Sequence, residues 1–95
     1  MTTRTDEQLV GDYLAGDRAA LRFLVERYLS HIYNFICRYV GHSAEAEDLS
    51  QEVFVKCWQH LKSFDTQKKF KTWLFTIAKN TALDWLKKKK TLNFS

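Results

Sequence analysis

The sequence contains few of the residues that interrupt regular structure or cross-link a chain. Its 95 residues include no proline, three glycines (Gly11, Gly16 and Gly41) and two cysteines. An all-β fold needs turn residues at short intervals, so this scarcity argues against one. It also leaves no glycine-rich loop that could cradle a phosphate. The composition therefore favours a helical protein.

The reactive side chains form no pattern typical of a catalytic or metal site. Cys37 and Cys57 lie within helical patterns among apolar neighbours, so we expect two buried free thiols. The three histidines do not cluster with them at metal-ligand spacing, and no Ser-His-Asp arrangement is evident. The acids of residues 45–52 fall at a helix start, where the helix dipole favours negative charge. We expect no enzyme, no metal site and no cofactor.

Long apolar runs are absent as well. No run approaches the roughly 20 residues of a membrane span. The first ten residues, MTTRTDEQLV, lack the apolar core of a signal peptide. We therefore expect one cytoplasmic domain, residues 1–95, with no membrane insertion.

Apolar residues recur every three or four positions along most of the chain, which predicts four helices. A capping box of Thr5 and Gln8 starts a short helix at Asp6, and Gly16 ends it. The others are expected over residues 18–40, 43–61 and 69–90, with Gly41 closing the second. The predicted fold is all-α, a single domain whose three long helices form the core, with the short first helix packed on it.

The expected buried sides follow from the same spacing. On the third helix we expect these side chains to be buried: Leu49, Val53, Phe54, Cys57, Trp58 and Leu61. On the fourth we expect a buried stripe: Phe70, Trp73, Leu74, Ile77, Ala78, Thr81 and Trp85. Phe75 lies off that stripe and is a candidate for an exposed ring.

Charge is unevenly distributed along the chain. From Thr66 to the end, eight lysines and one acid give a formal charge of +7. Up to Asp65, seven basic and ten acidic side chains give −3. A basic, aromatic helix is typical of a surface that meets phosphates and bases, so we take the C-terminal helix as the working part.

Two stretches, DLSQEVFVKCWQHLKSF and FKTWLFTIAKNTALDWL, carry a family resemblance. In their order and separation they resemble the second conserved domain of bacterial RNA polymerase sigma factors of the extracytoplasmic-function (ECF) type. The resemblance covers about residues 7–90. It implies a transcription initiation specificity factor domain that binds core RNA polymerase. Such a domain recognises and melts the promoter minus-ten element by capturing flipped bases of the non-template strand.

The resemblance assigns the third helix to polymerase. In the family, the DLxQE helix binds a coiled coil of the beta-prime subunit. The residues that we expect in this interface are Asp48, Leu49, Gln51, Glu52 and Val55. A polar face with one apolar centre suits a partner interface, although the same pattern is also found on a solvated helix face.

The resemblance assigns the last helix and the loop before it to promoter DNA. The expected contacts are Phe64, Asp65, Thr66, Gln67, Lys68, Lys69, Lys71, Phe75, Lys79, Asn80, Lys87 and Lys88. Phe64 would wall a base pocket while packing on its own domain, and Asn80 would read the base edge. The lysines would hold phosphates. The run at residues 87–90 would reach the upstream duplex, unless it is only a solvated helix end.

The chain also departs from the family pattern. Its loop, KSFDTQKK, lacks the usual glycine and small residue, and it places an acid, Asp65, beside Phe64. No segment after Lys90 could form the family's helix-turn-helix domain, so we expect a fragment or an isolated domain. An anti-sigma factor is a further partner implied by the family. The alternative function is a helical protein-interaction module whose basic helix binds an acidic protein partner rather than DNA.

Overall fold

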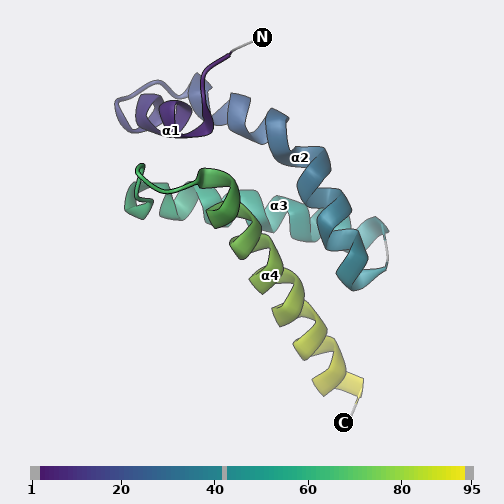
Figure 1. Cartoon of the computed structure of the whole chain (residues 1–95). Helices are drawn as coiled ribbons and strands as arrows, with labels where there is room; N and C mark the ends of the chain where they lie inside the picture. The colour runs from purple at the N-terminus through teal and green to yellow at the C-terminus, as the bar shows by residue number, and fades with distance from the viewer. Residues whose placement is uncertain (1–2, 42, 94–95) are drawn as a thin grey trace.

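The computed structural model describes residues 3–41 and 43–93, and over these ranges the chain is helical with no strand (Figure 1). The elements are α1 (Asp6–Leu14), α2 (Ala19–Val40), α3 (Ser43–His60), the 3₁₀ turn η1 (Leu61–Ser63) and α4 (Phe70–Asn93). The all-α prediction, with one short helix and three long ones, is confirmed. No helix in these ranges is long and apolar enough to cross a membrane.

The helix boundaries follow from local capping. The backbone N–H of Gln8 donates to the Thr5 hydroxyl at 3.1 Å, and the side-chain oxygen of Gln8 accepts from the backbone N–H of Thr5 at 2.9 Å. These two bonds form the predicted capping box. The Ala19 N–H donates to the Asp17 carboxylate at 3.1 Å. Gly41 has a φ of 70°, a left-handed conformation that glycine adopts at little cost and that ends α2.

The remaining boundaries differ slightly from the prediction. Ser43 is the first residue of α3, but its side chain and His42 lie outside the described residues. The third helix ends at His60, and η1 follows it. The last helix continues to Asn93 rather than ending near Lys90, because the sequence has no proline or glycine there to stop it.

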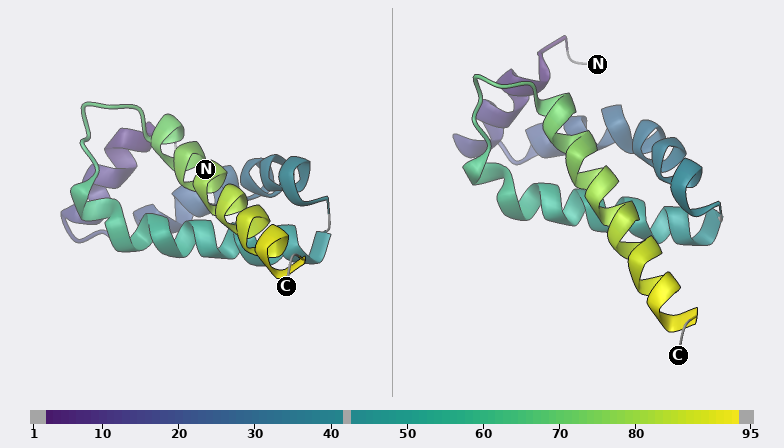
Figure 2. Two further views of the ribbon diagram at one scale, coloured as in Figure 1. Left: turned by 90° about the horizontal axis from the view of Figure 1, so that it is seen from below. Right: turned by 60° about the horizontal axis from the view of Figure 1, so that its bottom comes forward.

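The three long helices pack in pairs around one core (Figure 1). The helix α4 packs against both α2 and α3, and its C-terminal end extends away from the other helices (Figure 2). The molecule is accordingly elongated, with extents of 48 × 25 × 19 Å. The α4 residues 87–90, all lysines, therefore lie on the part of the helix that projects from the bundle.

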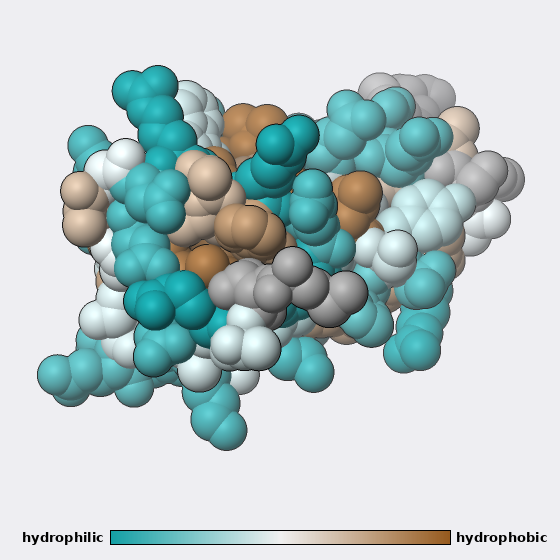
Figure 3. All heavy atoms as spheres, turned by 90° about the horizontal axis from the view of Figure 1, so that it is seen from above, coloured by the Kyte–Doolittle hydropathy of each residue, from teal (hydrophilic) through white to brown (hydrophobic). Residues whose placement is uncertain are grey.

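The core is built mainly from the predicted apolar stripes. The largest fully buried side chains include Leu24, Ile32, Ile36, Phe70 and Leu74. Seen from above, polar side chains surround smaller apolar areas on the surface (Figure 3).

The prediction for Trp58 is wrong, because its side chain is 51% exposed. Its indole Nε1–H donates to the Tyr13 hydroxyl at 2.7 Å, so it bridges α3 to α1 at the surface. Phe54, also expected in the core, is half-buried.

Both cysteines are free thiols. The Cys57 thiol is buried, and burial raises its pKa from 9.0 to about 12. Cys37, in contrast, is half-buried.

A hydrogen bond joins α3 to α4. The Lys56 ammonium donates to the buried Thr81 hydroxyl at 2.9 Å, and that hydroxyl donates to the Ile77 carbonyl at 2.8 Å.

The short helix α1 is tied to both α2 and α4. Asp6 accepts a hydrogen bond from the Tyr28 hydroxyl and forms an ion pair with Arg27 at 2.7 Å. Burial, followed by the bond to Asp6, raises the pKa of Tyr28. The Phe70 N–H, at the first residue of α4, donates to the Glu7 carboxylate at 2.8 Å. Because of this bond, α1 helps to place the start of α4.

Candidate nucleic-acid interface

The loop between η1 and α4, residues 64–69, forms an ordered turn without glycine. The Lys68 N–H donates to the Asp65 carbonyl at 2.9 Å, which closes a β-turn. The Gln67 N–H donates to the Asp65 carboxylate at 2.9 Å. No described non-glycine residue has a positive φ. The family's glycine is therefore not needed here, and Asp65 serves as the residue that organises the turn.

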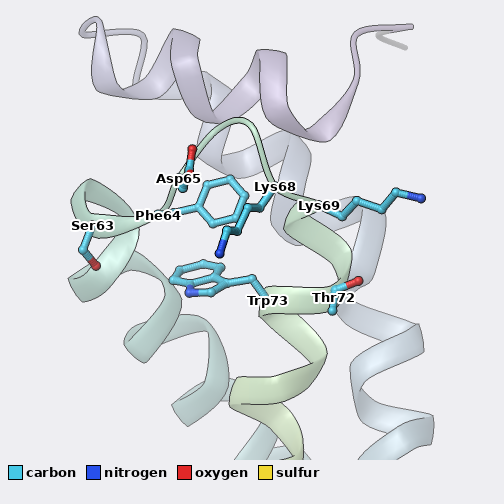
Figure 4. A pocket seen from close by; sticks show the side chains of 7 residues that line it. All are labelled: Ser63, Phe64, Asp65, Lys68, Lys69, Thr72 and Trp73. Atoms are coloured by element: carbon cyan, nitrogen blue, oxygen red, sulfur yellow. The ribbon is translucent and has the colours of Figure 1, made fainter.

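Phe64 anchors this loop to the body of the domain. Its side chain is only 7% exposed. Its ring packs edge-on against Phe70 at a centroid distance of 5.8 Å and tilted against Trp73 at 5.1 Å. The ring therefore packs on its own domain and walls a surface hollow at the same time, as Figure 4 shows.

This hollow, which we call the loop hollow, has a volume of about 600 Å³. Its lining residues are Ser63, Phe64, Asp65, Lys68, Lys69, Thr72 and Trp73. Two aromatic rings and two lysines thus meet at one depression, and Figure 4 shows the Phe64 and Trp73 rings next to each other. An apolar ring surface beside ammonium groups is suited to an unstacked base with its phosphate.

The sequence missed three of the lining residues. Trp73 was expected in the core, with a stacking platform as the alternative, and it is half-buried and lines the hollow. Its indole has an apolar body and a polar edge, and such rings often sit at the boundary of a core. Ser63 and Thr72 carried no distinguishing signal. Thr66 and Gln67 are exposed in the turn and do not line the hollow.

Asn80 does not lie beside Phe64, contrary to the expected joint pocket. It is seven residues after Trp73, which places it about 10 Å further along α4. It lines a separate depression, together with Leu83, Asp84, Leu86, Lys87 and Lys90. Any base that Asn80 contacts is therefore a different base from the one in the loop hollow.

The expected exposed ring of Phe75 is wrong. Phe75 is half-buried and packs edge-on against Phe35 of α2, with centroids 5.1 Å apart and planes at 88°. The neighbouring lysines Lys71 and Lys79 are exposed. Lys87 and Lys88 are also exposed, on the projecting half of α4.

The outer face of α3 carries most of the residues expected to bind polymerase. Asp48, Gln51 and Glu52 are exposed, and Val55 is 49% exposed. Leu49, in contrast, is only 7% exposed and belongs to the core. It can hold the helix in place but does not present its side chain to a partner.

Comparison with known proteins assigns the family. A family model described as Sigma-70 region 2 matches residues 24–91, most of the chain. The chain belongs to the sigma-70 region 2 family.

Within the described ranges, no group of three or more His, Cys, Asp or Glu side chains is arranged to hold a metal ion.

Several curated relatives are ECF sigma factors. The chain is 41% identical over 75 residues to the ECF RNA polymerase sigma factor SigW of Bacillus subtilis strain 168, covering 79% of this chain and 40% of that protein. It is 40% identical over 82 residues to the ECF RNA polymerase sigma-E factor of Escherichia coli strain K12, covering 86% and 42%. The chain thus spans less than half the length of these relatives.

Two solved structures share the region 2 fold. One is described as an engineered region 2 of sigmaE in complex with GTAAAA, with a TM-score of 0.85, 40% identity and 95% coverage of both chains. The other is CnrH in complex with the cytosolic domain of CnrY, with a TM-score of 0.77 and 28% identity over 83% of this chain and 51% of that one.

Proposed function

We propose that this chain is the region 2 domain of an ECF sigma factor and that it captures a non-template base of the promoter minus-ten element in the loop hollow. The supporting observation is the meeting of Phe64, Trp73, Lys68 and Lys69 at one depression. The likeness to a sigmaE region 2 in complex with GTAAAA supports it as well. The domain would act by binding, without catalysis or a cofactor, in the cytoplasm.

Base capture follows from the chemistry of the hollow. Stacking of a base on an aromatic side chain contributes about 1–3 kcal/mol, whatever the base. Lysines beside the ring attract the phosphates, which makes binding depend steeply on salt. Promoter melting would result because the flipped base is held on the protein and cannot re-pair. The lysines on the projecting half of α4 would contact the upstream duplex backbone.

We propose the exposed face of α3 as the docking site for the beta-prime subunit of core RNA polymerase. The contacts would come from Asp48, Gln51 and Glu52 around the half-exposed Val55. Polar side chains around an apolar centre are typical of such interfaces.

We further propose that an anti-sigma domain competes for these surfaces. The related CnrH is described in complex with the cytosolic domain of CnrY. A domain covering α3 and the loop hollow would block polymerase and DNA together. Competition binding with polymerase core and with oligonucleotide would separate the two effects.

The test is strand discrimination. A labelled DNA strand containing GTAAAA, and its complement, are titrated with the protein at several salt concentrations. We expect the protein to bind the strand containing GTAAAA more tightly than its complement, and we expect this preference to persist as the salt concentration rises. Equal affinity that depends only on salt would contradict base capture. Binding to acidic proteins without a preference for either strand would favour the alternative of a protein-interaction module.

Asn80→Ala supplies a second test. If the Asn80 amide reads a base edge, discrimination at one position should fall by about 1–3 kcal/mol. Because Asn80 lies outside the loop hollow, that position should differ from the one held beside Phe64. A panel of single-base changes in the strand, measured by fluorescence anisotropy, locates both positions. Unchanged discrimination at every position would make Asn80 an ordinary surface residue.

A further inference from the structure

A second hollow lies between α2 and α4, with a volume of about 380 Å³. Its lining residues are Phe35, Lys71, Thr72, Phe75, Thr76 and Lys79. We call it the α2–α4 hollow. Its apolar surface comes from Phe35 and Phe75, whose half-buried rings meet edge to face at 5.1 Å. A further ring, Tyr39, packs tilted against Phe35 with the ring centroids 5.3 Å apart.

The two hollows are neighbours on the same helix. Thr72 lines both of them, with the loop hollow on the side of Trp73 and the α2–α4 hollow on the side of Phe75. Among the described lining residues, this exposed side chain is the one common to both hollows. A single strand with one base in the loop hollow would therefore carry a following base past the second hollow.

The charges around the second hollow have one sign. Lys71, Phe75 and Lys79 follow one another at intervals of four residues, so the ring lies between two lysines on one side of α4. Both lysines are exposed, and none of the described residues that line the hollow is acidic. An aromatic surface between two ammonium groups has the chemistry of a site for a nucleobase and its flanking phosphates.

We propose that the α2–α4 hollow is a second nucleobase subsite, which holds another base of the strand whose captured base occupies the loop hollow. The new contact residue is Phe35 of α2. The proposal rests on the proposed function, since it takes its ligand from there. It makes the recognised element a pair of held bases, with the phosphates around the second base held by Lys71 and Lys79.

The test combines Phe35→Leu with strands lacking single bases. Leu keeps an apolar side chain but removes the ring face, so affinity for the intact GTAAAA strand should fall by about fivefold or more. Abasic residues are then placed at each position in turn. At the position held by Phe35, the variant and the unchanged protein should bind equally, because the partner of the ring is already missing.

The chain offers a matched control on the same helix. Phe23 is exposed, lines neither hollow and lies twelve residues before Phe35, about 18 Å along α2. Phe23→Leu should bind every strand as the unchanged protein does. Phe35→Tyr, which keeps the ring, should also retain affinity for the intact strand.

Several results would overturn the proposal. One is a loss in Phe35→Leu that is the same on every abasic strand, which would make the ring structural. Another is no loss at all. A third is an abasic scan of the unchanged protein with only one sensitive position, and this readout needs no variant to fold. Binding of a hexaglutamate peptide that depends on Phe35 would point to a protein partner instead. Failure of the proposed function looks different, because the unchanged protein would then show no strand preference and no sensitive position.

Discussion

Glu7 shows how one side chain far away in sequence can shape the nucleic-acid interface. The first turn of a helix leaves backbone N–H groups without helical partners. At α4 the Glu7 carboxylate accepts a hydrogen bond from the N–H of Phe70, whose buried ring packs against Phe64 and Trp73. A carboxylate at that end also suits the helix dipole. Glu7 is therefore a positioning residue for the start of α4.

Replacing Glu7 should destabilise the domain. Glu7→Ala leaves the Phe70 N–H without its acceptor, and we expect a loss of about 1–2 kcal/mol in the free energy of unfolding. Urea unfolding followed by circular dichroism measures it. Glu7→Gln keeps an acceptor oxygen and should lose less. Equal losses in the two variants would show that the negative charge, rather than the hydrogen bond, carries the effect.

Cys57 predicts how stability depends on alkaline pH. Burial raises the pKa of its thiol from 9.0 to about 12, so above pH 9 the unfolded chain releases a proton that the folded chain retains. The contribution of the Cys57 thiol to stability is therefore fully present below pH 9 and is lost as pH rises towards 12. Between pH 9 and 10 we expect a decrease of about 1 kcal/mol per pH unit. Tyr28, with its raised pKa, adds to the decrease above pH 10.

The variant Cys57→Ala checks this assignment. It removes the titrating thiol, so the decrease between pH 9 and 10 should largely disappear, although the variant starts from a lower stability because a buried atom is lost. Urea unfolding at fixed pH values, with a reductant present, gives both quantities. A decrease of the same size in the variant would assign the pH dependence to other groups.

At the scale of elements, α3 separates a buried side from an outer face that we propose for polymerase. Glu52→Lys on that face should weaken binding to core RNA polymerase by at least about tenfold and leave oligonucleotide binding unchanged, because the loop hollow is built from other elements. Gln51→Ala should act in the same direction more weakly. Surface plasmon resonance with polymerase core and with oligonucleotide measures both activities.

The matched control for Glu52 lies on α2. Glu26 is also exposed and also faces a basic residue four positions away, with Arg22 at 3.6 Å corresponding to Lys56 at 3.7 Å. Glu26→Lys makes the same change of charge outside the proposed interface, so polymerase binding should persist. If Glu52→Lys lost both activities together, α3 would have a structural role only.

The elements were largely predictable from sequence, and the exceptions have physical reasons. Capping chemistry and apolar spacing predicted α1 and the end of α2, because both depend on local residues. Trp58 was misplaced because its spacing matches the buried stripe, while only the fold shows that α1 ends beside it and offers the Tyr13 hydroxyl. Phe75 was misplaced because its partner, Phe35, comes from another helix.

The site was predicted less completely than the helices. Motif position pointed to the loop, and the structure places Phe64, Lys68 and Lys69 at one hollow, while their contact with DNA stays a prediction. It could not show that Trp73 is only half-buried and lines the hollow, since its spacing fits a core position equally well. Nor could it show that Phe64 and Asn80 line different hollows, because that depends on where the loop packs against α4.

At the scale of the whole molecule, charge and shape are arranged together. The acidic part of the chain forms α1, α2 and α3, and the basic part forms α4, which extends beyond the bundle (Figure 2). A projecting basic helix can follow a nucleic-acid backbone while the bundle contacts a protein. The proposed DNA and polymerase contacts therefore come from different elements of one small domain.

The central claim is that a base is held against the aromatic wall of the loop hollow. Nuclear Overhauser effects between labelled protein and the preferred single strand test it most directly. We expect contacts from the Trp73 indole and the Lys68 side chain to the protons of a single base, at the position where an abasic residue weakens binding most. Contacts confined to lysine side chains and the sugar-phosphate backbone, with none to the Trp73 ring, would contradict the account.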